Sequence, residues 1–214
     1  MVEARRIAVV GNAPSERVVA AQVDGCDVVV RLNKARGLGG LTGKRVDELV
    51  LINCGGQMEE WLRTGVIERS PAFRTASTIA LPIHPRKADL IVPPLSPPER
   101  NAADGQDYSE AARARYAALG KTVRAWDADF FARSMDELGH APLRRHGPAP
   151  STGYLAVRWW LTADPSCHVE AFGFGFAGWW GHDWDGERRW FQSAAARGRL
   201  TLHPLEASAE RRAA

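Results

Sequence analysis

The stretch RIAVVGNAPS, residues Arg6–Ser15, decides the fold class of this chain. Its apolar, β-branched run stops at a glycine, which is typical of a strand buried on both faces of a parallel sheet. Gly11 permits a sharp backbone turn, and Asn12 or Ser15 is a candidate cap for a helix over residues 16–22. Ligands of open α/β sheets bind outside the carboxyl ends of such strands, often against a helix N-terminus.

A second β-branched run, DVVVRLNK over Asp27–Lys34, ends in polar and cationic residues. Because the carboxyl ends of parallel strands meet at one edge of the sheet, Asn12, Arg31, Asn33 and Lys34 form a candidate anion site. The same spacing equally fits an ordinary β–α–β unit whose Arg31 and Lys34 face solvent. Spacing alone leaves both interpretations open.

Further apolar runs predict an α/β fold with a mostly parallel central sheet flanked by helices. The expected strands cover residues 6–11, 27–32, 47–53, 76–82, 122–126 and 168–174. The expected helices after the first cover residues 57–64, 108–119, 130–138, 155–162 and 186–197. Residues 91–107, rich in Pro, Asp, Asn and Ser, predict a lid, a binding loop or local disorder. Because no repeat or linker interrupts the pattern, we expect a single domain over residues 1–214.

Charge and cysteine content exclude several classes of protein. Lys and Arg number 28 and Asp and Glu 25, a net charge of +3 spread along the chain. Nucleic-acid-binding domains usually cluster such charge, so we expect no nucleic-acid partner. No apolar run is long enough for a membrane span, and no signal peptide is recognisable. Cys26, Cys54 and Cys167 have spacings that suit neither zinc nor a disulfide framework, which favours a cytoplasmic protein.

The glycine-rich segment Gly37–Arg45 is similar to a phosphate-binding loop only at first sight. A P-loop requires glycine where Leu38 stands and Ser or Thr where Arg45 stands. Thr42 also occupies the final glycine position of a GxGxxG motif. We therefore predict a flexible connection here.

The second informative region begins with PSTGY, residues Pro150–Tyr154. Ser151 or Thr152 is suited to cap the following helix, and Gly153 leaves its first turn bare for a ligand to reach the backbone N–H groups. The run HVEAFGFGF, residues 168–176, then predicts a strand that ends at Gly173. Glycines at strand ends mark close backbone approach, to a ligand or to a neighbouring element. A well-capped helix before a glycine-rich turn, without any ligand, explains the same residues.

The third region is HDWDGERRW, residues His182–Trp190. A histidine titrates near neutral pH and can take a proton from a hydroxyl nucleophile. Glu187 falls in the first turn of the expected helix, where it would orient His182 or interact favourably with the helix dipole. The alternative is that His182 packs among the surrounding tryptophans.

Together, the three regions resemble the sialyl motifs of the animal-type sialyltransferases, glycosyltransferase family 29. The large motif is similar to residues 10–12 and 31–35, the small motif to residues 150–153 and 172–175, and the very small motif to His182 with Glu187. The order and approximate separations also agree. The matched pieces cover roughly a third of the chain, and their joint occurrence is more specific than any one alone.

The resemblance implies a Rossmann-like, GT-A-variant domain from a compact, bacterial-like relative. It implies transfer of a sialic acid or related keto-sugar acid from a CMP-activated donor to a glycan or other hydroxyl acceptor. The implied reaction inverts the configuration at the anomeric carbon of the sugar and needs neither metal nor cofactor. The implied donor-binding residues are Asn12, Arg31, Asn33, Ser151, Thr152, Gly153 and Gly173. The implied catalytic residues are His182, as general base, and Glu187.

The chain also departs from this family. The family's disulfide would join Cys167 to a cysteine before Val9, where Arg6, Ile7 and Ala8 stand, so that bridge cannot form. The family's additional histidine motif is not separately present, and the membrane anchor of the Golgi enzymes is not seen. The triplet Asp183–Asp185 has the letters of a metal-binding DxD motif but overlaps the very small motif.

Two alternatives to a transferase follow from these departures. The first is a nucleotide-binding accessory protein that keeps the CMP pocket and has lost transfer activity. The second is an unrelated Rossmann-like enzyme such as a methyltransferase or dehydrogenase. The second is disfavoured because Arg31 and Asn33, rather than an acidic residue that would bind a ribose, end the second strand.

Overall fold

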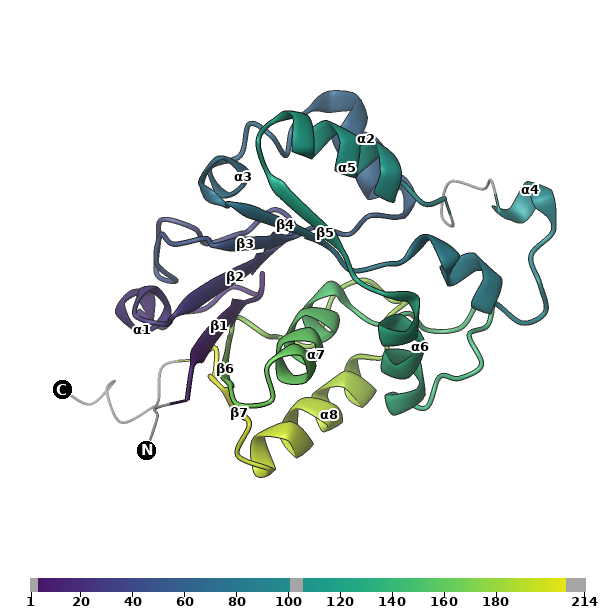
Figure 1. Cartoon of the computed structure of the whole chain (residues 1–214). Coiled ribbons are helices and arrows are strands. Elements are labelled where there is room, and N and C mark those ends of the chain that lie inside the picture. Colours follow the sequence, from purple (N-terminus) through teal and green to yellow (C-terminus); the bar gives the residue numbers. More distant parts are fainter. Residues whose placement is uncertain (1–3, 101–105, 207–214) are drawn as a thin grey trace.

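The computed structural model describes residues 4–100 and 106–206, which form a seven-stranded parallel sheet between two layers of helices (Figure 1). The strands are β1 (Arg6–Val10), β2 (Val28–Leu32), β3 (Glu48–Val50), β4 (Thr78–Leu81), β5 (Thr122–Ala125), β6 (His168–Phe172) and β7 (Leu200–Leu202). Their order across the sheet is β5-β4-β3-β2-β1-β6-β7. The chain therefore changes direction across the sheet between β1 and β6, and crevices for ligands form at such a switch point.

Helices cover both faces of the sheet. The bounds are α1 (Ala20–Asp24), α2 (Gly55–Thr64), α3 (Pro71–Thr75), the 3-10 helix η1 (Pro85–Leu90), α4 (Pro97–Arg100), α5 (Ser109–Ala118), α6 (Ala128–Glu137), α7 (Thr152–Ala163) and α8 (Trp184–Ala196). Helices α2, α3 and α5 lie on one face and α6, α7 and α8 on the other (Figure 1). The segment that carries η1 and α4 extends to one side of the two layers.

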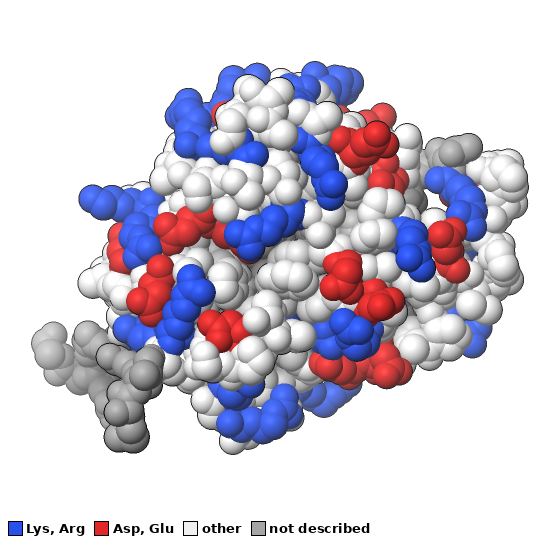
Figure 2. Space-filling model, viewed as in Figure 1, with Lys and Arg blue, Asp and Glu red and all other residues white. Residues whose placement is uncertain are grey.

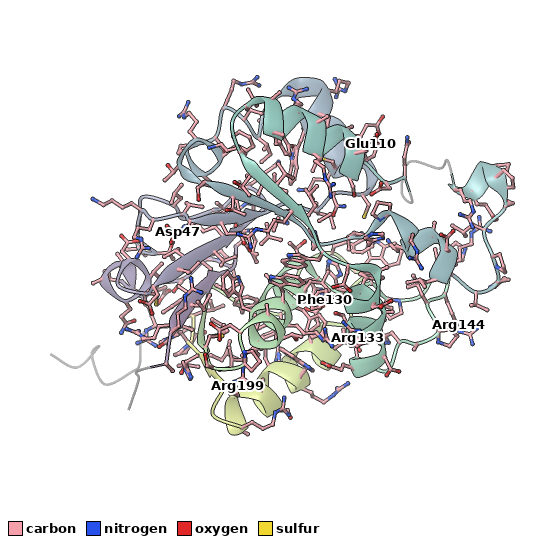
Figure 3. The ribbon with its side chains drawn as sticks, viewed as in Figure 1. Asp47, Glu110, Phe130, Arg133, Arg144 and Arg199 are labelled. Atoms are coloured by element: carbon pink, nitrogen blue, oxygen red, sulfur yellow. The ribbon has the colours of Figure 1, made fainter. Side chains whose placement is uncertain are left out.

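The alternation of side chains along the strands supplies both cores, because successive residues of a strand point to opposite faces. On the α7 side, buried residues of β1 and β2 pack against the helices; these include Ile7, Val9, Val30, Leu32, Phe130, Tyr154 and Phe191. On the other side, β3 and β4 pack against α2, α3 and α5 through Leu49, Leu51, Ile79, Trp61, Phe73 and Tyr116. Phe130 of α6 points into the packed layer, whereas Arg133 of the same helix lies at its outer side (Figure 3).

The six predicted strands and the parallel α/β architecture are confirmed, with bounds shorter by one or more residues. The helices expected over 57–64, 108–119, 130–138, 155–162 and 186–197 correspond to α2, α5, α6, α7 and α8. The sequence did not predict β7, α3, η1 or α4. The loop predicted over 91–107 contains α4, and residues 101–105 lie outside the described part of the chain.

The helix expected over residues 16–22 is wrong in its bounds and its cap. Helix α1 begins only at Ala20, and no side chain caps it. Ser15 instead donates its hydroxyl hydrogen to the carbonyl oxygen of Leu205, which lies after β7 (3.0 Å). A side chain that can cap a local helix is here used for a contact with a distant segment, which local sequence does not reveal.

Residues 37–45 are a fixed connection rather than the flexible one predicted. The carboxylate of Asp24 accepts the backbone N–H groups of Lys44 and Arg45 at 3.0–3.1 Å. Gly43 takes a φ of 80°, in the left-handed region that favours glycine. The glycines therefore shape a turn that is fastened to the end of α1.

Candidate functional site

Two glycines bring the carboxyl ends of β1 and β6 together at the switch point. The N–H of Gly11 donates to the carbonyl oxygen of Phe172 (2.7 Å), and the N–H of Ala13 donates to that of Gly173 (3.1 Å). Gly173 has a φ of 70°, and a Cβ there would lie 2.9 Å from the carbonyl oxygen of Gly11. These glycines therefore serve close approach between two neighbouring strands.

Asn33 lies directly after β2. Its Oδ1 is bound within the protein, whereas its Nδ2 makes only one long contact. Its backbone is left-handed, with a φ of 52°, which asparagine tolerates better than most residues. Oδ1 accepts the N–H of Ile52 (2.9 Å). Nδ2 lies 3.5 Å from Oγ1 of Thr152, at the start of α7. The amide nitrogen of Asn33 and the hydroxyl of Thr152 thus lie side by side with donors available to a ligand.

Asn12 holds the ends of β1 and β2 together. Its Oδ1 accepts the N–H of Arg36 (2.7 Å), and its Nδ2 donates to the carbonyl oxygen of Leu32 (3.0 Å). One hydrogen of the amide is left over from these contacts. Asn12 therefore belongs to the site region mainly as a brace for the backbone.

Arg31 does not face this region, so its prediction as an anion ligand is corrected. The side chain is fully buried, and its guanidinium donates to the carbonyl oxygens of Thr42, Gly43 and Arg45 at 2.6–3.0 Å. Burial lowers the pKa of Arg31 to about 10. Arg31 is still within β2, and the alternation of the strand turns it toward the 37–45 turn rather than off the strand end.

The N-terminus of α7 is capped by Ser151. Its hydroxyl oxygen accepts the N–H of Tyr154 (3.1 Å). The N–H groups of Thr152 and Gly153, in the same first turn, have no hydrogen-bond partner within residues 4–100 and 106–206. Gly153 is glycine for a packing reason rather than to leave its turn bare, because a Cβ there would lie 2.8 Å from the ring of Phe174.

Glu187 of α8 binds Ser151 and makes no contact with His182 in the described part of the chain. Its two carboxylate oxygens accept the N–H and the hydroxyl of Ser151, both at 2.6 Å. Only 1% of Glu187 is exposed, and this burial raises its pKa to about 7 against the lowering effect of the two hydrogen bonds. Of the two predicted roles, orienting His182 directly is therefore wrong, whereas the place in the first turn of a helix is correct.

His182 is half-buried and is held by one ring nitrogen. Its Nδ1 lies 2.6 Å from the carbonyl oxygen of Ala149, so Nδ1 carries the hydrogen of that bond. The rings of Trp179 and Trp184 meet the imidazole edge-on, each with centroids 4.9 Å apart. Nε2 has no hydrogen-bond partner among the residues that the structure describes. Burial lowers the pKa of His182, and the bond to Ala149 partly opposes this.

Residues 149–151 join the small-motif and very-small-motif regions. The N–H of Ala149 donates to the carbonyl oxygen of Gly181 (2.9 Å). The carbonyl of Ala149 accepts from His182, and Ser151 binds Glu187. We call this set of hydrogen bonds the seam. It brings the predicted residues at the starts of α7 and α8 together, and no pattern in the sequence indicates the part played by Ala149.

Asp183 of the DWD triplet is a helix cap. Its Oδ1 accepts the N–H of Gly186 (2.9 Å), and its Oδ2 lies 3.1 Å from Nε2 of His140. Within the described residues, no group of three or more His, Cys, Asp or Glu side chains is placed to hold a metal ion. Cys26, Cys54 and Cys167 are free thiols.

The face shown in Figure 2 carries acidic and basic side chains interspersed, without a continuous patch of one sign. None of the helices in the part of the chain that is described is long and apolar enough to cross a membrane. Neither observation singles out a macromolecular partner, so the switch point between β1 and β6 and the adjoining seam remain the features that call for a function.

Comparisons with known proteins agree with this architecture. No family model matches the chain. It is 27% identical over 215 residues to the "Urease operon 23 kDa accessory protein" of Rhizobium meliloti (strain 1021), covering 97% of each chain.

Two kinds of solved sialyltransferase have a similar structure. A mammalian sialyltransferase in complex with Gal-beta-1-3GalNAc-ortho-nitrophenol superposes with a TM-score of 0.57 and 20% identity, over 94% of this chain and 70% of that one. The sialyltransferase CstII from Campylobacter jejuni, in complex with the substrate analogue cytidine-5'-monophosphate, gives a TM-score of 0.54 and 10% identity, over 97% and 82%. The resemblance drawn from the three motifs is thus confirmed for the fold: this chain has the fold of the sialyltransferases.

Proposed function

We propose that this protein transfers a sialic acid or a related keto-sugar acid from a CMP-activated donor to a hydroxyl group, with His182 as the general base. The observation that carries the proposal is the geometry of His182, whose Nδ1 is fixed on the carbonyl of Ala149 while Nε2 is left without a partner among the described residues. This fixes the tautomer in which Nε2 is the proton acceptor. The sialyltransferase fold supports the choice of reaction.

The donor is placed at the switch point between β1 and β6. In this proposal its phosphate and sugar carboxylate lie against the N-terminus of α7, where the N–H groups of Thr152 and Gly153 and the positive end of the helix dipole favour anions. The amide nitrogen of Asn33 and the hydroxyl of Thr152 supply further donors. Asn12, Ser151 and Gly173 act by shaping the backbone there.

The proposed reaction is a direct displacement. The acceptor hydroxyl gives its proton to Nε2 of His182 as its oxygen forms a bond to the anomeric carbon of the sugar. The bond from that carbon to the phosphate oxygen breaks, and its electron pair leaves with CMP. Burial keeps the imidazole neutral before the reaction, and the carbonyl of Ala149 stabilises the imidazolium through Nδ1–H afterwards.

A second candidate is a nucleotide-binding accessory protein without transfer activity. The observation in its favour is that the Rhizobium relative, which matches along 97% of both chains, is named as a urease operon accessory protein. On this alternative the CMP site is kept and the acceptor side is unused.

The two candidates differ in turnover rather than in binding. We expect CMP, but not UMP, S-adenosylmethionine or NAD, to raise the melting temperature of the protein, with or without EDTA. CMP-sialic acid and CMP-Kdo are then incubated with the protein in EDTA, with lactose as acceptor, and released CMP and product are measured by mass spectrometry. Release that depends on His182 supports transfer. CMP binding without release from either donor favours the accessory protein, and no CMP binding contradicts both.

A further inference from the structure

Two neighbouring tryptophans on the loop between β6 and α8 leave most of their rings in solvent. Trp179 is 55% exposed and Trp180 is 86% exposed, with ring centroids 5.6 Å apart. Among the described residues, they are the one pair of exposed large apolar side chains adjacent in sequence. An exposed apolar patch of this kind is often a functional site.

The loop is built to present these rings. A Cβ on Gly181 would lie 2.4 Å from Cζ3 of the Trp179 ring, so only glycine lets the ring take its position. The indole N–H of Trp184 donates to the carbonyl oxygen of Trp179 (3.0 Å). Gly178 has a φ of 144°, and a Cβ there would press on the ring of Trp184 at 3.3 Å. These contacts hold Trp179 in place, and the ring of Trp180 lies next to it, with centroids 5.6 Å apart.

The pair also adjoins the proposed base. The ring of Trp179 meets the imidazole of His182 edge-on at 4.9 Å, and Nε2 of that imidazole is free of partners in the described chain. A group that lies on the tryptophans therefore has its edge close to the proton acceptor.

We infer that Trp179 and Trp180 form a stacking surface for a pyranose ring of the acceptor, which deepens the proposed function and rests on it. One face of a β-galactopyranoside presents a continuous set of C–H groups, which are weakly positive. The face of an indole is electron-rich, so the two surfaces are complementary. The ring's hydroxyl groups stay at the edge, where one of them can reach His182. We call the pair the tryptophan platform.

The size of the platform and the mixed charges of the helix that follows favour a sugar over a larger partner. Two indoles at these exposed fractions offer roughly 300 Å² of surface, well below the about 800 Å² per partner of a stable protein interface. Asp185, Arg188 and Arg189, which follow the pair in the sequence on α8, are exposed and carry charges of both signs. Mixed charges of this kind suit a hydroxylated ring better than a lipid surface.

Nuclear magnetic resonance of the indole N–H groups tests this inference without requiring turnover. The whole protein, saturated with CMP, is titrated with methyl β-D-galactopyranoside, and glycerol serves as a polyol without a ring. Variants W179F and W180F identify the two resonances among the eight tryptophans. We expect the sugar, and not glycerol, to shift these two resonances.

Substitutions then separate an aromatic face from simple apolar surface. W180A and W180L should each weaken binding of the galactoside about tenfold, whereas W180F should stay within about threefold of wild type. The affinity for CMP, measured by calorimetry on the same samples, should not follow these changes. Leu119→Ala is the control, because Leu119, after α5, is an apolar residue that is 52% exposed, close to the 55% of Trp179; it should leave the galactoside affinity unchanged.

The outcomes distinguish this inference from the proposed function. Shifts at the two tryptophans with no transfer from any CMP-activated donor would support the platform and contradict the transferase. Transfer to lactose with an acceptor KM unchanged in W180A and W180L would overturn the platform and keep the transferase. Loss of a dimer or of vesicle binding in W180A, with the galactoside affinity unchanged, would also overturn it.

Discussion

The polar groups of the seam at the start of α7 are bound within the protein, whereas the rings of the tryptophan loop beside it are exposed to solvent. In the seam, Ser151 uses its N–H and its hydroxyl within the protein, and Glu187 is almost fully buried. In the loop, Trp180 is largely in solvent. His182 belongs to both regions, since Nδ1 is bound in the seam and Nε2 is left over.

The difference shows which atoms contribute to stability and which are available for function. A buried polar atom with its partner holds a geometry, and removing the partner costs free energy of unfolding. An atom left without a partner at an accessible place adds little to stability and is available to a ligand. Asn33 divides in the same way, with Oδ1 bound to Ile52 and Nδ2 nearly free. The predictions below test that division, beginning with the largest effect.

Replacing His182 should lower transfer by about 10²–10⁴-fold, the range of positioned proton transfer. Asn places an amide nitrogen where Nδ1 stands, so H182N keeps a donor for the carbonyl of Ala149 while H182A does not. Both variants should lose turnover equally. Only H182A should also lose stability, by about 1 kcal/mol.

Single-turnover rates and urea unfolding on the same two variants make the measurement. Full transfer in either variant would show that His182 is a packed residue rather than the base. A stability loss equal in both would show that the bond from Nδ1 contributes nothing.

The second prediction compares two residues at the end of β2, Asn33 directly after the strand and Arg31 within it. Asn33→Ala removes the free Nδ2 donor and should weaken CMP binding by roughly 1.5–3 kcal/mol, the value for hydrogen bonds to charged groups. Arg31→Met removes the donors of three carbonyl oxygens in the 37–45 turn. It should lower stability and leave the CMP affinity of the folded protein within about twofold, because a hydrogen bond to CMP would be worth more than that.

Calorimetric titration with CMP measures both variants. If the Arg31→Met protein is folded but has lost its CMP affinity, Arg31 is an anion ligand after all, contrary to its contacts in the structure. Equal CMP affinities of wild type and Asn33→Ala would instead show that the donor does not bind at the end of β2.

These two residues also show how far the sequence alone leads. The β-branched runs and terminal glycines were enough to predict six parallel strands, because short runs of this composition are typical of strands in a sheet buried on both faces. The direction of Arg31 was missed although the predicted strand, residues 27–32, included it. Arg31 was grouped with the polar residues that follow the strand, and the alternation of side chains along the strand was not applied to it. β7 was missed because Leu200–Leu202 is too short for a period-two pattern to be recognised.

For the site, sequence located the residues but not their contacts. The motifs gave His182, Glu187 and Ser151, and the structure brings them together at one end of α7. That Glu187 binds Ser151 rather than His182 depends on contacts between residues far apart in the chain, which no local pattern encodes. The sequence also contains an indication of the platform that led to no prediction, a tryptophan pair between Gly178 and Gly181.

The third prediction measures the stability held in the seam. Ser151→Ala removes the cap of Tyr154 N–H and one partner of a buried carboxylate, and should lower the free energy of unfolding by about 2 kcal/mol. Ser70 is a matched control, because it caps α3 through the N–H of Phe73. Ser70→Ala should cost about 1 kcal/mol.

Urea unfolding gives the difference between the two serines, and that difference is the contribution of the Glu187 contact. If both variants lose the same stability, the contact between α7 and α8 is not energetically important. The seam would then be a coincidence of geometry rather than the brace proposed here.

The smallest effect is a pH dependence that belongs to Glu187. Burial raises its pKa from 4.5 to about 7 in the folded protein. Between these pH values the folded state keeps a proton that the unfolded state releases, so the free energy of unfolding falls as pH rises. The contribution of Glu187 is thus most favourable below pH 4.5 and is lost by about pH 7. The slope reaches at most about 1.4 kcal/mol per pH unit.

Glu187→Gln isolates this effect, because glutamine does not titrate and its amide can still accept the N–H of Ser151 and donate to its hydroxyl. Urea unfolding of both proteins from pH 4 to 8 gives a difference in which the other titratable groups, present in both, largely cancel. The stability of wild type relative to the variant should decline as pH rises from 4.5 through about 7, and level off above that. A difference that does not change with pH would mean that the carboxylate is already charged at pH 5, so that the seam is more open to water than its burial indicates.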